Sequence, residues 1–135
     1  MKDIKFRAWS KAEEKMYLPE KSDMLSINFL GGVSYGGDTW ADDMVLMQYT
    51  GLKDKNGREI YEGDIVKEQG ARINNLPAAP FFKEIVFYEG KFMAKDVGID
   101  DPQLYINIAH SSYNEVLGNI YENPELLKPE LLEKK

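Results

Sequence analysis

The sequence predicts a mainly β protein, and three observations lead to this prediction. Apolar and polar residues alternate along several segments, such as "IKFRAW" at residues 4–9, with the period of a strand that buries one face. Turn residues, including "DKNG" and "EGD", separate these segments at short intervals. Helical periodicity is scarce until the end of the chain. A total of about nine short strands is typical of a small closed or half-closed barrel with extra strands attached.

The expected elements can be justified in chain order from this alternation. The predicted strands cover residues 4–9, 16–17, 24–30, 44–50, 58–61, 65–69, a hairpin at 84–97, and then 104–109 and 115–121. Residues 31–39 are rich in glycine, which predicts a loop or a long hairpin tip. The pairs Asn56–Gly57, Gly63–Asp64 and Glu89–Gly90 are expected to reverse the chain.

Only the C-terminal tail has helical character. Asn123 can cap a helix and Pro124 suits its first position, but Pro129 removes an amide donor from any continuous helix. We therefore expect two single turns or one short broken helix. The leucines of the tail are expected to pack on the chain's own domain, with a partner surface as the alternative: Leu126, Leu127, Leu131 and Leu132.

Length and composition limit the function classes. The 135 residues are enough for one domain or two small subdomains, and the absence of cysteine excludes disulfides, thiolate metal sites and a cysteine nucleophile. Charges interrupt the N-terminal segment, and no window approaches the roughly 18 apolar residues of a membrane span. A soluble, cytoplasmic protein without a membrane partner is therefore expected.

The charge balance disfavours nucleic-acid binding. The chain has 23 acidic residues against 17 lysines and arginines, and a phosphate-binding surface would have to assemble from dispersed basic residues near the N-terminus. The residues available for this are Lys2, Lys5, Arg7, Lys11 and Lys15. A small β-barrel associated with nucleic acid is thus the alternative prediction, not the first.

The candidates for catalysis and metal binding each have a simpler structural interpretation. His110 is the only histidine, and Ser111 and Ser112 follow it directly, where a turn is a simpler interpretation than a nucleophile and its base. Two nearby carboxylates, Asp100 and Asp101, do not make a complete metal site with His110. No catalytic residue, metal ligand or cofactor site is predicted here, and the protein is not expected to be an enzyme.

Three further patterns also favour structure over chemistry. "DKNG" resembles the middle of a calcium loop, but this register places Leu52 and Gly63 at positions that require carboxylates. The acidic residues Asp38, Asp42 and Asp43 are expected in a solvated loop. The glycines at 31, 32, 36 and 37 precede no lysine of a phosphate-binding loop.

Aromatic residues provide the one candidate binding surface. Tyr35 and Trp40 flank the glycine-rich loop, so they are the aromatic pair most expected to be exposed. Large side chains with a polar tip give contact area at a small entropy cost. Packing in the core is the competing interpretation of both residues.

Three segments resemble the signatures of the YopX-like family of phage and prophage proteins. They are "IKFRAW" at 4–9, "MQYTGLKDKNGREIYEGDIV" at 47–66 and "EVLGNIYENPELL" at 115–127, together 39 of 135 residues. The resemblance implies a mostly β protein whose C-terminal part is similar to an SH3-type barrel. It implies no assigned activity and no functional residues. The sequence departs from the family pattern at Ser10 and Phe87, and residues 68–83 match no signature, so they are a candidate specificity loop.

The complete prediction combines these observations. An N-terminal β subdomain is expected over residues 1–43, an SH3-like barrel over 44–122 and a short helical tail over 123–135. The function expected is that of a non-enzymatic interaction module encoded by a phage or prophage and acting in the bacterial host cytoplasm. Its partner would be an unknown host or phage protein, or a second copy of the chain.

Overall fold

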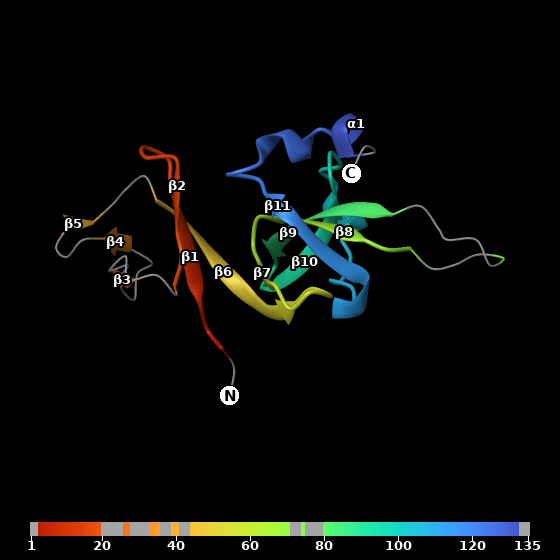
Figure 1. Ribbon diagram of the computed structural model, residues 1–135, viewed down its shortest axis with the longest axis horizontal. Helices are drawn as coiled ribbons and strands as arrows, with labels where there is room; N and C mark the ends of the chain where they lie inside the picture. The colour runs from red at the N-terminus through yellow and green to blue at the C-terminus, as the bar shows by residue number, and fades with distance from the viewer. Residues whose placement is uncertain are drawn as a thin grey trace. The chain divides into compact units, whose positions relative to one another are not determined.

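The computed structural model describes residues 3–19, 26–27, 33–35, 39–40, 44–70, 74 and 80–132. These residues are mainly β, as predicted, and they divide into two compact units, Met1–Tyr49 and Thr50–Lys135 (Figure 1). The strands are β1 Phe6–Ser10, β2 Lys15–Tyr17, β3 Ser26–Ile27, β4 Val33–Tyr35, β5 Thr39–Trp40, β6 Met44–Lys53, β7 Glu59–Tyr61, β8 Asp64–Glu68, β9 Phe81–Tyr88, β10 Lys91–Asp96 and β11 Asn114–Asn119. The helical turns are η1 Pro102–Leu104, η2 Ser111–Tyr113, η3 Pro124–Leu127 and α1 Pro129–Leu132.

The first unit contains β1 between β2 and the first half of β6, with both neighbours antiparallel to it. Ala8 lies opposite Tyr17 on one side and Leu46 on the other, and it is fully buried. A small residue at the central position lets larger neighbours close over the strand. The turn after β1 is held by Ser10, whose Oγ accepts a hydrogen bond from the backbone N–H of Glu13 at 3.1 Å.

The glycine-rich segment differs from the expected loop. β3, β4 and β5 form a three-stranded antiparallel sheet in which Ser26 lies opposite Ser34, and Ser34 lies opposite Trp40. β4 therefore occupies the middle of the segment predicted to be a loop.

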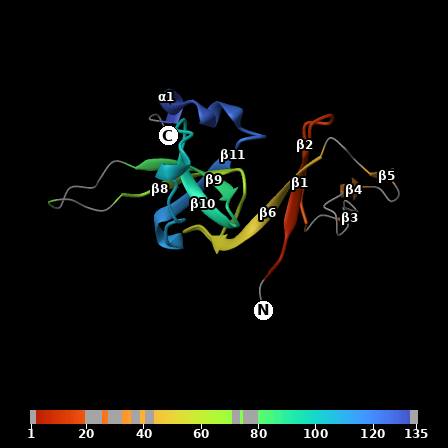
Figure 2. The ribbon, with the colours of Figure 1, turned by 180° about the vertical axis from the view of Figure 1, so that it is seen from behind.

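The second unit is built on a four-stranded antiparallel sheet in the order β10-β9-β8-β11 (Figures 1 and 2). A bulge between Val116 and Gly118 interrupts the pairing of β11 with β8. Each face of this sheet carries a buried cluster. One contains Ile60, Val66, Ile85, Ala94 and Val116; the other contains Ile65, Val97, Leu126 and Leu132. Neighbours in sequence such as Ile65 and Val66 serve opposite clusters because successive strand residues point to opposite faces.

The turn between β6 and β7 is organised by Asp54. Its Oδ1 accepts hydrogen bonds from the backbone N–H groups of Asn56 and Arg58, both at 2.9 Å. Gly57 has a φ of 81°, whereas Asn56 is not among the residues with positive φ. The reversal is thus a three-residue loop with glycine in the left-handed position, which replaces the two-residue Asn–Gly turn that we expected.

The second reversal of this stretch is at Gly63, as predicted. Gly63 has a φ of 84°, and the Oδ2 atom of Asp64 accepts a hydrogen bond from the backbone N–H of Tyr61 at 2.8 Å. Both backbone polar groups of Gly63 are bonded, its N–H to the carbonyl of Ile85 and its carbonyl to the N–H of Ile120. This corner therefore joins the turn between β7 and β8 to β9 and to the residue that follows β11.

After β11, the chain turns at Asn119 and ends in η3 and α1, drawn in blue in Figure 2. The Asn123 side chain does not cap η3, contrary to the expectation from sequence; its Oδ1 accepts from the backbone N–H of Asn119 at 3.2 Å. Leu126 and Leu132 are buried, whereas Leu127 is exposed. In the described part of the chain, no helix is long and apolar enough to cross a membrane.

The segment at residues 104–109 is not the strand that its alternating pattern predicted. It forms a single antiparallel bridge in which Ala94 and Ile106 exchange both backbone hydrogen bonds. The preceding residues instead form η1, because the carboxylate of Asp101 accepts from the N–H of Gln103 and Pro102 begins the turn. Only Ile108 then packs against the first apolar cluster.

Candidate interaction surface

The residues that the sequence singled out for binding lie partly outside the described structure. Tyr35 ends β4 and Trp40 ends β5, but the described structure does not include their side chains. The glycines at 31, 32, 36 and 37 and the aspartates at 38, 42 and 43 also lie outside the described residues, as do residues 71–73 and 75–79 of the candidate specificity loop at 68–83. A binding role for Tyr35 and Trp40 remains a prediction.

His110 caps a turn. Its Nδ1 accepts a hydrogen bond from the backbone N–H of Ser112 at 3.2 Å and lies 2.9 Å from the Oγ of the same serine. The ring is therefore the N-cap of η2, an arrangement that holds three consecutive residues in place. Among the residues that the structure covers, no group of three His, Cys, Asp or Glu side chains is arranged to hold a metal ion.

A surface rich in aromatic residues lies at the end of the β9–β10 hairpin. Glu89 and Gly90 have φ values of 48° and 82°, so both central residues of the turn are left-handed, as in the tight hairpin turns that match strand twist. This turn places Phe87 opposite Phe92, and their rings meet edge to face at 5.1 Å. Phe87 is 51% exposed although it is among the larger apolar residues of the chain.

The hairpin surface continues onto the segment beside β10. We define it as the residues Phe87, Tyr88, Phe92, Leu104, Tyr105 and Ile106. Paired residues share a face of the sheet, so Phe87, Phe92 and Ile106 project to one side. Tyr88 projects to the other side, where its ring meets that of Tyr105 edge to face at 5.3 Å. The end of the hairpin is therefore aromatic on both faces.

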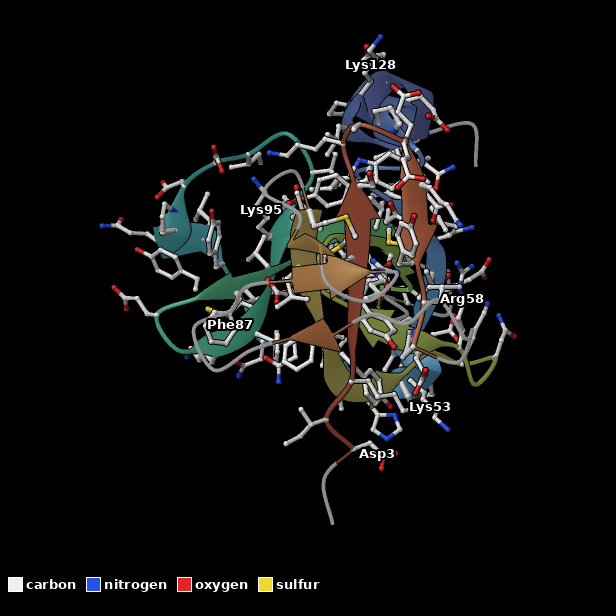
Figure 3. The ribbon with its side chains drawn as sticks, turned by 90° about the vertical axis from the view of Figure 1, so that its left-hand side faces the viewer. Asp3, Lys53, Arg58, Phe87, Lys95 and Lys128 are labelled. Carbon is white, nitrogen blue, oxygen red and sulfur yellow. The ribbon has the colours of Figure 1, made fainter. Side chains whose placement is uncertain are left out.

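A charged group borders the two tyrosines. Lys95 lies opposite Glu84 in the register, with its Nζ 3.8 Å from Glu84 Oε1 and 2.7 Å from Asp100 Oδ1. The hydroxyl of Tyr105 donates to the same Oδ1 of Asp100 at 3.4 Å. We call Glu84, Lys95, Asp100 and Tyr105 the Lys95 cluster. Figure 3 labels Lys95 and Phe87 on the same hairpin.

The electrostatics of the Lys95 cluster follow from its uneven burial. Burial raises the pKa of Glu84, and the Lys95 ammonium only partly offsets this. For Lys95, burial lowers the pKa, but the hydrogen bond to Asp100 and the Glu84 charge outweigh it, so the pKa is raised. The hydrogen bond from Lys95 lowers the pKa of Asp100. The Lys95 ammonium thus interacts with the carboxyl groups of both Glu84 and Asp100.

The pKa of the Tyr105 phenol is also raised above its ordinary value. Burial raises its pKa, the Lys95 ammonium opposes the shift, and the carboxylate of Asp100 adds to it. The phenol therefore stays protonated at neutral pH and acts as a hydrogen-bond donor to Asp100. The cluster can bind polar groups, but its ionisable groups already hold one another.

Sequence reasoning did not bring these residues together. The tyrosines and Asp100 were each visible, but Tyr88 and Tyr105 are 17 positions apart. They meet because the η1 turn precedes Tyr105, in a segment that the sequence predicted to be a strand. The available signal was the Glu89–Gly90 turn, because centring the hairpin there pairs Phe87 with Phe92 and Glu84 with Lys95.

The fold and this surface describe a small, mainly β protein with aromatic side chains presented on a hairpin. The chain belongs to the YopX family, since the model of that family, described as "YopX protein", matches residues 5–128. No curated protein matches the chain.

A solved structure supports the fold over nearly the whole length. This chain is similar to the crystal structure of protein EF1440 from Enterococcus faecalis, with 32% sequence identity and a TM-score of 0.60. The similarity covers 95% of this chain and 100% of the Enterococcus chain.

Proposed function

We propose that this protein is a non-enzymatic protein-interaction module, encoded by a phage or prophage and acting in the bacterial host cytoplasm. The observation that supports this proposal is the hairpin surface. Rings at the end of a rigid two-stranded turn give a binding partner large contact area without loss of side-chain freedom. Phe87 and Ile106 are exposed on one face of this hairpin, and Tyr88 is exposed on the other.

The finer architecture belongs to the same proposal. We propose that the strands β7 to β11 make an SH3-type barrel with a short helical tail covering one of its faces. Buried clusters on both sides of the four-stranded sheet, and the corner at Gly63 that joins β7, β9 and the end of β11, support this interpretation. Small barrels of this kind commonly bind through their loops and hairpins.

Several acidic side chains form hydrogen bonds or ion pairs within the fold, which supports the non-enzymatic interpretation. Asp54 and Asp64 are buried and accept hydrogen bonds from backbone N–H groups. Asp96 is paired with Lys83, and Asp100 with Lys95. A general base needs a lone pair free for its substrate, and Asp54 and Asp64 use theirs to hold the fold.

Nucleic-acid association is the second candidate, and the structure weakens the surface on which it was based. Arg7, central to the basic residues near the N-terminus, is only 6% exposed and cannot reach a phosphate without rearrangement. Lys15 lies over the ring of Tyr17, with its Nζ 4.6 Å from the ring centre. No specific observation now favours this candidate over the first.

The proposal can be tested by comparing variants in a capture experiment. The tagged full chain, its Phe87→Ser variant and its Leu52→Ser variant are each incubated with a lysate of bacteria carrying the phage, and retained proteins are quantified. Leu52 is also an exposed apolar residue but lies outside the hairpin surface. We expect one protein to be retained by the wild type and by Leu52→Ser but lost with Phe87→Ser.

Two further measurements complete the test: the affinity of the purified partner protein for each variant, and the mass of the chain in solution. The retained protein is purified and its affinity for each variant is measured by calorimetry, with circular dichroism to show that both variants are folded. Equal affinity for Phe87→Ser and the wild type would overturn the role of the surface. A chain that retains nothing and is monomeric by light scattering would overturn the interaction module itself.

A further inference from the structure

We infer that the tyrosine side of the hairpin surface recognises an arginine in an extended, basic segment of the partner protein. This inference rests on the proposed function and specifies the chemistry of its partner. The site consists of the Asp100 carboxylate and the rings of Tyr88 and Tyr105.

The carboxylate is held in position but still open to solvent. The Asp100 side chain is 85% exposed, and its two hydrogen bonds, from Lys95 Nζ and the Tyr105 hydroxyl, both go to Oδ1. These bonds orient the group, so its ordering entropy is already lost before a ligand arrives. Oδ2 lies on the same exposed group and can accept a hydrogen bond from an incoming cation.

The tyrosine pair selects arginine over lysine. The rings of Tyr88 and Tyr105 are inclined at 79°, so at least one ring can turn a face toward a ligand while its edge contacts the other. A guanidinium can stack on such a face and also donate to a carboxylate in the same plane. An ammonium is a more strongly hydrated point charge and gains less from the ring.

The surrounding charge favours a basic segment. Residues 83–101 contain five acidic side chains, Glu84, Glu89, Asp96, Asp100 and Asp101, and three lysines, Lys83, Lys91 and Lys95, so their net charge is 3 − 5 = −2. A negative surface attracts a cationic segment and repels a phosphate backbone. Leu104, which directly precedes Tyr105, is exposed and offers an apolar contact to the rest of the segment.

The probe for this site is a set of three blocked pentapeptides. They are Gly-Val-Arg-Val-Gly and the same peptide with lysine or with uncharged citrulline in place of arginine. Each is titrated into the ¹⁵N-labelled full chain and followed by amide chemical shifts. We expect saturable shifts at Tyr88, Lys95, Asp100 and Tyr105 with the arginine peptide, weaker binding of the lysine peptide and none of the citrulline peptide.

A matched pair of variants separates the carboxylate from the general charge of the chain. Asp100→Asn should lower the affinity for the arginine peptide by roughly fivefold or more, because a charged hydrogen-bond acceptor becomes a neutral one. Glu130→Gln removes another exposed carboxylate elsewhere and should leave binding unchanged. The amide spectrum of each free variant shows that its fold is retained.

Defined results overturn the inference. Citrulline and arginine peptides binding equally, shifts mapping away from these residues, or equal loss in both variants would each exclude arginine recognition. Concentration-dependent shifts at the same residues without peptide would assign the surface to a second copy of the chain and also exclude it. If Asp100→Asn keeps the natural partner while Phe87→Ser loses it, the arginine site fails but the interaction module stands.

Discussion

The Oδ2 of Asp54 accepts a hydrogen bond at 2.9 Å from the backbone N–H of Val116, which lies 62 positions further along the chain. Its Oδ1 accepts two more from within its own turn. One buried carboxylate thus joins the β6–β7 loop to β11. These two segments are the parts of the chain where the second and third family signatures occur.

Replacing Asp54 with alanine should destabilise the fold strongly. The substitution leaves three backbone donors without their acceptor, one of them the buried amide of Val116. We expect a loss of about 2–4 kcal/mol in the free energy of unfolding. Urea denaturation followed by circular dichroism measures it.

The matched control is Asp101→Ala. Asp101 also accepts from a backbone N–H two residues ahead, that of Gln103, but its turn is exposed. A loss of at most about 1 kcal/mol is expected there. Equal losses for the two variants would show that the connection to Val116 contributes nothing.

Stability should also depend on pH through Asp54. Burial raises the pKa of this carboxyl, but hydrogen bonds from the Val116, Arg58 and Asn56 amides and the charge of Arg58 outweigh it, so the pKa lies below its ordinary value of 3.8. Because the folded-state pKa is depressed, this contribution is fully present above 3.8 and is lost as the pH falls through the lower folded-state value.

The corresponding measurement is the free energy of unfolding at several pH values between neutral and strongly acid. The wild type should lose stability on the acid side, and Asp54→Asn should show a shallower loss because it removes one of the titrating groups. Parallel curves for the two proteins would contradict a depressed pKa at Asp54.

Gly63→Val should damage the corner between β7 and β8. A valine at the φ of 84° places a β-branched side chain in a left-handed conformation, at a buried position whose N–H and carbonyl are both bonded. The loss should be at least about 1 kcal/mol, seen as a lower melting temperature by circular dichroism. An unchanged melting temperature would refute the role of this corner.

Gly57→Val is the control for conformational strain alone. Gly57 has a φ of 81°, but a Cβ there would meet no atom within 4 Å, and the residue is exposed. Gly57→Val should therefore cause a smaller loss of stability than Gly63→Val. A larger cost at Gly57 would assign the effect to backbone strain and not to the buried corner.

Gly118→Ala should disturb the turn that follows β11. A Cβ at this position would lie 2.7 Å from Asn123 Cγ and 3.0 Å from Leu126 Cδ1. The clash displaces the amide that accepts from the Asn119 N–H, and a cost of about 1–3 kcal/mol is expected. Urea denaturation of the variant measures it.

A double-mutant cycle identifies the cause. Asn123→Ala removes the side chain that the new methyl group would meet, so adding Gly118→Ala to it should cost less than in the wild type. Additive losses would mean that Gly118 is required for another reason, such as the bulge in β11.

The sequence by itself determined the features that depend on local chemistry. Alternation predicted a mainly β chain, and Gly63 and Gly90 predicted chain reversals, where the structure has both glycines at positive φ. Pro129 separates two short helical turns. The reason is that strand alternation, left-handed backbone and missing amide donors are properties of a few adjacent residues.

Only the tertiary structure decided which of these residues meet. Residues 104–109 alternate like a strand, but the η1 turn and a single bridge at Ile106 leave them outside the sheet. The same turn brings Tyr105 to Tyr88 and to Asp100. Whether an alternating segment becomes a strand depends on a free edge in the right register, and that edge belongs to residues elsewhere in the chain.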